Sequence, residues 1–170
     1  MLGVVVTATA AVAGDNSKKQ FRTALSGYEE VPVLSTPGVG SFNAAVNRGE
    51  TEIRYVLRYE ALPTAVEQAH IHFEQQTNNG PITAFLCSNL TGAPAGTPTC
   101  PAMGGTVTRT IGAEQVGAGA AAQGIAAGEI GELIAAMRAG ATYVNVHTTA
   151  FKGGEIRGQL GGKHRGRHDD

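Results

Sequence analysis

Three of the five histidines in this chain lie in two segments that are rich in β-branched and aromatic residues, a composition typical of β-strands. His70 and His72 lie in the segment 66–73, and His147 lies in the segment 142–149. Side chains two residues apart point to the same face of a strand, so His70 and His72 are predicted to lie side by side. Two such imidazoles form half of a site for a first-row transition metal, and His147 could supply a third ligand.

The metal that such a site favours is copper, which suits three imidazoles, and zinc fits nearly as well. A carboxylate from Glu30 or Glu155 could complete the site or orient one of the rings. Arg157 could pair with a carboxylate such as Glu30 close to the histidines. Two alternatives stay open at this point. The histidines could have a structural role, as hydrogen-bonding groups at a sheet surface, or the two motifs could lie on remote strands.

Composition and motifs exclude several other classes of protein. The chain has 170 residues, of which 42% are hydrophobic and 16% charged, so it can bury the core of a single domain. Its net charge of −1 argues against nucleic acid as a main partner. The sequence has no Ser-His-Asp order, no His-Glu-x-x-His motif and no convincing phosphate-binding loop, which argues against a hydrolase or a nucleotide-binding protein.

Short strand-like segments separated by glycine-rich turns predict an all-β fold, an antiparallel Greek-key-like β-sandwich with one short helix. The clearest strand is 51–59, in which every second residue from position 53 is apolar. Further strands are predicted at 21–26, 39–46, 66–73, 81–87, 105–110 and 142–149. The helix is predicted at 129–139, where apolar residues at positions 130, 133, 134 and 137 form one stripe and Gly140 supplies a stop. The Ala- and Gly-rich residues 113–128 before it are predicted to form a loop or a loosely helical connection.

Cys87 and Cys100 flank a loop that contains prolines and glycines. A disulfide between them would close this loop and stabilise the fold by about 3 kcal/mol on the chain-entropy model. The alternative is a pair of metal-binding thiolates, but the sequence has no Cys-x-x-Cys pattern, so the disulfide is favoured.

The two ends of the chain predict export and a polar tail. Residues 1–13 are apolar, too short to span a bilayer, and end in Ala-Val-Ala, which is typical of a signal-peptide cleavage site. The alternative is a buried N-terminal strand. Together with the cysteines, this end predicts a secreted, periplasmic or cell-envelope protein without a membrane span. The polar residues 161–170 are predicted to be a disordered tail.

Several motifs resemble, in order and spacing, the chordin-type (CHRD) domain. They are Leu25-Ser26-Gly27 with Glu30-Val31-Pro32, Ala69-His70-Ile71-His72, Gly80-Pro81-Ile82, the residues 140–148 and the residues 153–160. The resemblance covers residues 21–160 and implies an extracellular, mostly β domain with no settled biochemical activity. The His-x-His strand is also similar to a copper-ligand strand of copper/zinc superoxide dismutase.

Three functions therefore compete. The first is a non-catalytic extracellular binding module with a histidine-based copper or zinc site and a possible extracellular protein partner. The second is a redox metalloenzyme similar to superoxide dismutase, although a dinuclear site would need more than the three histidines that the domain offers. The third is a structural envelope or matrix protein that forms homo-oligomers through its edge strands.

Overall fold

The computed structural model describes residues 19–161, so the predicted signal segment at 1–13 and all but the first residue of the predicted tail lie outside it. The strands are β1 (Gln20–Ser26), β2 (Val39–Val46), β3 (Ile53–Glu60), β4 (Val66–Phe73), β5 (Ile82–Ser88), β6 (Gly105–Ile111), β7 (Thr142–Thr148) and β8 (Ile156–Leu160). The helices are α1 (Ile130–Ala139) and three 3-10 turns, η1 (Gly27–Glu29), η2 (Ala113–Gln115) and η3 (Ala118–Gln123).

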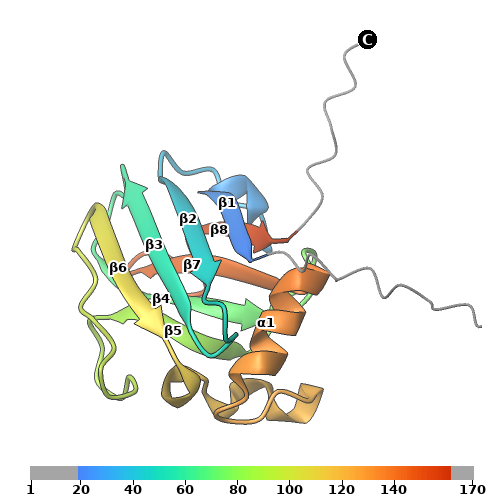
Figure 1. Ribbon diagram of the computed structural model, residues 1–170. Coiled ribbons are helices and arrows are strands. Elements are labelled where there is room, and N and C mark those ends of the chain that lie inside the picture. The colour runs from blue at the N-terminus through green and yellow to red at the C-terminus, as the bar shows by residue number, and fades with distance from the viewer. Residues whose placement is uncertain (1–18, 162–170) are drawn as a thin grey trace, which may run out of the picture.

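All eight strands belong to one antiparallel sheet in the order β5-β4-β7-β8-β1-β2-β3-β6. This sheet curls over, so that β4, β5, β7 and β8 lie across the core from β1, β2, β3 and β6 (Figure 1). Strand β3 shows the period of two that the sequence predicts, because Ile53, Tyr55, Leu57 and Tyr59 are buried in that core. The predicted all-β fold with antiparallel strands and one short helix is confirmed.

The one α-helix in the described part of the chain lies at one end of the core (Figure 1). Leu133, Ile134 and Met137 are fully buried along one side of α1. Gly140 ends the helix in the left-handed conformation, with a φ of 74°. The Ala- and Gly-rich segment before the helix contains the 3-10 turns η2 and η3, so its predicted loosely helical character is confirmed. No helix among residues 19–161 is long and apolar enough to cross a membrane.

The predicted disulfide is present between Cys87, near the end of β5, and Cys100, with 5.1 Å between the Cα atoms. Asn89 secures the bridged loop to the start of β4. Its amide nitrogen donates to the carbonyls of Val66, at 2.9 Å, and of Cys100, at 3.0 Å. The bridge therefore ties a long loop to the same layer of the sheet that carries the histidines.

Candidate metal site

The three histidines lie on the face of β4 and β7 that points away from the core. On β4, His70 and His72 flank Ile71, which is buried in the core, and on β7 His147 follows the core residue Val146. The strands β4 and β7 are hydrogen-bonded neighbours, so the two histidine motifs are not on remote strands. Although this face points outward, loops cover it, and the three side chains are between 0% and 6% exposed.

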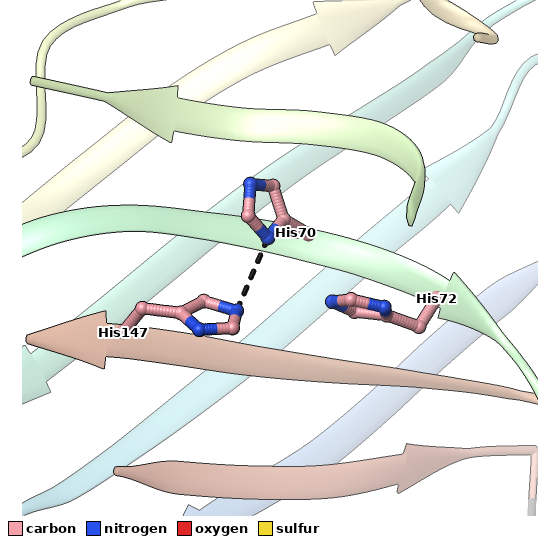
Figure 2. A group of neighbouring side chains, drawn as sticks. All are labelled: His70, His72 and His147. Atoms are coloured by element: carbon pink, nitrogen blue, oxygen red, sulfur yellow. Dashed lines mark hydrogen bonds between the residues drawn. The ribbon is translucent and has the colours of Figure 1, made fainter. Parts of the chain in front are cut away.

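The imidazole nitrogens converge on one another (Figure 2). One nitrogen of each ring can be chosen so that all three lie within 4.8 Å of one another. Nδ1 of His70 lies 3.2 Å from Nε2 of His147. The centre of the His72 ring lies 5.4 Å from the centre of the His70 ring and 6.0 Å from that of the His147 ring. Zinc–nitrogen bonds of about 2.0–2.1 Å place two ligands of a tetrahedral ion about 3.3 Å apart. The rings of His70 and His147 already have this spacing, and a small movement of the His72 ring would bring its nitrogen to the same ion.

Backbone carbonyls fix the proton positions of two of these rings. Nδ1 of His72 donates to the Gly80 carbonyl at 2.8 Å, and Nδ1 of His147 donates to the Lys152 carbonyl at 2.9 Å. A carbonyl oxygen can only accept, so in each neutral ring the other nitrogen, Nε2, carries a lone pair. Metal-binding histidines are oriented in the same way by a hydrogen bond from their second nitrogen.

Burial keeps the imidazoles neutral. Loss of solvent lowers the pKa of His70 to about 2, with further lowering by the charges of His147 and His72, and lowers the pKa of His72 to about 4. Burial also lowers the pKa of His147. Nε2 of His70 and Nε2 of His72 are buried without a hydrogen-bond partner. The cluster therefore offers neutral nitrogen ligands whose hydrogen-bonding capacity is not fully used.

Arg157 holds the loop 74–81, whose Gly80 carbonyl contacts His72. It is 1% exposed, and its guanidinium donates to Asn79 Oδ1 at 3.1 Å and to three backbone carbonyls of the same loop at 2.8 to 3.2 Å. Its Cζ lies 3.3 Å from the centre of the Tyr143 ring, which stacks in parallel on His72 with the ring centres 4.7 Å apart. Arg157 thus positions the loop 74–81 and, through the Tyr143 ring, the imidazole of His72.

Glu30 reaches the site through the neighbouring Asn145. Burial raises the pKa of Glu30 to about 7, against the opposing effects of the Arg157 charge and of hydrogen bonds from the Val31 backbone and the Asn145 side chain. Gly154 lies against both side chains, with a φ of 124°, and a Cβ atom at this position would overlap with Glu30 Oε1 and Asn145 Nδ2. A glycine here lets Glu30 and Asn145 pack against the turn before β8.

Glu155, the other candidate carboxylate, has different partners. Its two oxygens accept hydrogen bonds from the hydroxyls of Thr36 and Thr148, each at 2.6 Å. Thr148 follows His147 on β7 and therefore points to the opposite face of the strand. Glu155 joins the β7–β8 turn to the segment before β2, and its carboxylate does not orient an imidazole.

Asn145 is the site residue that the sequence reasoning missed. Its Oδ1 lies 2.9 Å from Nε2 of His147, its side chain is 2% exposed, and it also acts on the pKa of His72. The signal was in the sequence, because Asn145 and His147 are two residues apart on β7, as His70 and His72 are on β4.

One of the comparisons with known proteins gives a match. The CHRD domain family matches residues 21–160, a range that includes the whole sheet except the first residue of β1, together with all three histidines. No curated protein and no solved structure gives a significant match. Because the family match spans most of the chain, this protein belongs to the CHRD domain family.

Proposed function

We propose that this CHRD domain is an exported, non-catalytic binding module that holds one copper or zinc ion through His70, His72 and His147. The observation that carries the proposal is the convergence of three buried imidazoles, two of which have an Nε2 atom without a hydrogen-bond partner. A buried polar atom without a partner costs about 1–3 kcal/mol. A metal ion would remove that cost at His72 and use the lone pairs that the Gly80 and Lys152 carbonyls leave on Nε2 of His72 and of His147.

Export is supported by the disulfide between Cys87 and Cys100, because such bonds persist mainly in oxidising compartments. The apolar residues 1–13, which the structure does not describe, support it through their cleavage-site pattern. Secretion, a periplasmic location and the cell envelope all satisfy both features. Its proposed partner in such a place is an extracellular protein or a second copy of the domain.

A binding role is favoured over redox catalysis because the site is closed. His70 is fully buried with its ring edge-on against Phe85, and Arg157 holds the loop 74–81, whose Gly80 carbonyl contacts His72. A substrate would have to displace these covering groups before it reached the metal. An ion at this position would instead link β4 to β7 and stabilise the outer face of their layer.

The test is a titration of the metal-free protein with Zn(II) and with Cu(II) at pH 7.4, by calorimetry and by competition with a chelator. We expect one ion per chain, and we expect His147→Ala to weaken binding strongly. The matched control is a double variant, His164→Ala with His168→Ala, which removes the same ring type from the C-terminal tail. Equal binding by wild type and by a variant with all three site histidines replaced would refute the proposal.

A further inference from the structure

We propose that Asn145 supplies the fourth ligand of this metal site through its side-chain oxygen, which would leave the bound ion without an open coordination position. This inference rests on the proposed metal site and says how its coordination sphere is completed. Structural zinc sites have four protein ligands, whereas catalytic sites keep one position for water or substrate. The identity of the fourth ligand therefore decides which kind of site this is.

The geometry places the Asn145 oxygen among the ligand nitrogens. Oδ1 lies 2.9 Å from Nε2 of His147, and that nitrogen lies 3.2 Å from Nδ1 of His70. Metal bonds of about 2.0–2.2 Å to nitrogen and oxygen give ligand–ligand distances of about 2.9 Å at right angles and about 3.4 Å at tetrahedral angles. Both observed distances lie within this range, so the three atoms can share one ion.

The polarity of the contact between Asn145 and His147 also points to a cation. The proton on Nδ1 of His147 is donated to the Lys152 carbonyl, so Nε2 of the neutral ring carries only a lone pair. The amide oxygen of Asn145 is likewise an acceptor. Two acceptors that face each other at 2.9 Å in a buried site repel each other unless a positive charge lies between them. A metal ion bound to both atoms would turn this repulsion into attraction.

The neighbours of Asn145 keep its oxygen turned to the histidines. The amide nitrogen faces the opposite side, where Glu30 is its partner and the backbone at Gly154 packs against it. A carboxylate can only accept and an amide nitrogen can only donate, so this orientation turns the nitrogen toward Glu30 and the oxygen toward the histidines. At 2% exposure Asn145 has little contact with water, so water is a poor competitor for the oxygen.

The experiment replaces the native ion with Co(II), whose visible spectrum reports coordination number, and then adds azide as an external ligand. For wild type we expect a four-coordinate spectrum that azide does not change. Asn145→Ala should bind Co(II) about 10–100-fold more weakly, and azide should shift its spectrum, because a position is then open. Asn43→Ala, on β2 in the opposite layer, is the matched control and should behave as wild type.

Two results would overturn this inference while leaving the three-histidine site intact. One is an azide-dependent change in the wild-type spectrum, a measurement that does not depend on whether any variant folds. The other is an Asn145→Ala protein with the wild-type spectrum and affinity. Failure of wild type itself to bind Co(II) or Zn(II) would overturn the metal site and the fourth ligand together.

Discussion

Replacement of Arg157 by lysine should destabilise the protein far more than its conservative chemistry suggests. The guanidinium makes four hydrogen bonds to the loop 74–81 and stacks on Tyr143. A lysine ammonium cannot reproduce the planar fork, so we expect about three of these bonds to be lost. At about 1–1.5 kcal/mol for each bond, and with buried carbonyls left without donors, the free energy of unfolding should fall by about 3–5 kcal/mol. For a chain of this size that corresponds to a melting temperature lower by about 10 °C.

The measurement is urea unfolding of the metal-free protein together with limited proteolysis of the loop 74–81. Arg22→Lys is the matched control, because Arg22 is an exposed residue of β1 in the other layer of the sheet. We also expect Arg157→Lys to weaken metal binding, since the same loop carries the Gly80 carbonyl that orients His72. A loss of stability within 0.5 kcal/mol of the control, about the scatter of surface substitutions, would show that Arg157 does not secure this loop.

Three further outcomes test the fold and the site. Replacing Cys87 and Cys100 together by alanine should lower the free energy of unfolding by about 3 kcal/mol, seen as an earlier urea midpoint; an unchanged midpoint would contradict the role of the bridge. Gly154→Ala should cost at least about 1–3 kcal/mol from its φ of 124° and its overlap with two side chains, whereas Gly153→Ala, with nothing within 4 Å, should be nearly neutral in the same thermal melt. The free energy of unfolding of the metal-free wild type should exceed that of His72→Asn by about 3 kcal/mol less at pH 4 than at pH 7. The reason is that the pKa of His72 is about 4 in the folded protein and 6.5 in the unfolded chain, so protonation at low pH favours the unfolded chain. A constant difference across this range would disprove the lowered pKa of His72.

Local patterns in the sequence account for most of the secondary structure. The alternation that begins at Ile53 predicts β3 because a strand with one face in the core needs an apolar residue at every second position. The stripe that ends at Met137 predicts α1, and Gly140 predicts its end. The pairing of Cys87 with Cys100 was predictable because the chain has only these two cysteines.

The candidate site divides between what the sequence determines and what only the folded chain decides. The sequence by itself places His70 and His72 on one face, since the period of a strand is a local property of the backbone. Only the tertiary structure brings His147 beside His70, because the pairing of β4 with β7 joins residues that lie 77 positions apart in the sequence.

Sequence patterns also could not predict which groups bury the three histidines. An outward face normally meets water, yet here the three histidines are buried: Arg157 holds the loop 74–81 whose Gly80 carbonyl contacts His72, Lys152 contacts His147, and Phe85 lies against His70. Glu155 and Glu30 are both glutamates near family motifs, but the turn before β8 directs Glu155 to two threonine hydroxyls and leaves Glu30 beside Asn145. Which polar side chain reaches the histidines depends on contacts between distant segments, and a pattern along one segment carries no information about those contacts.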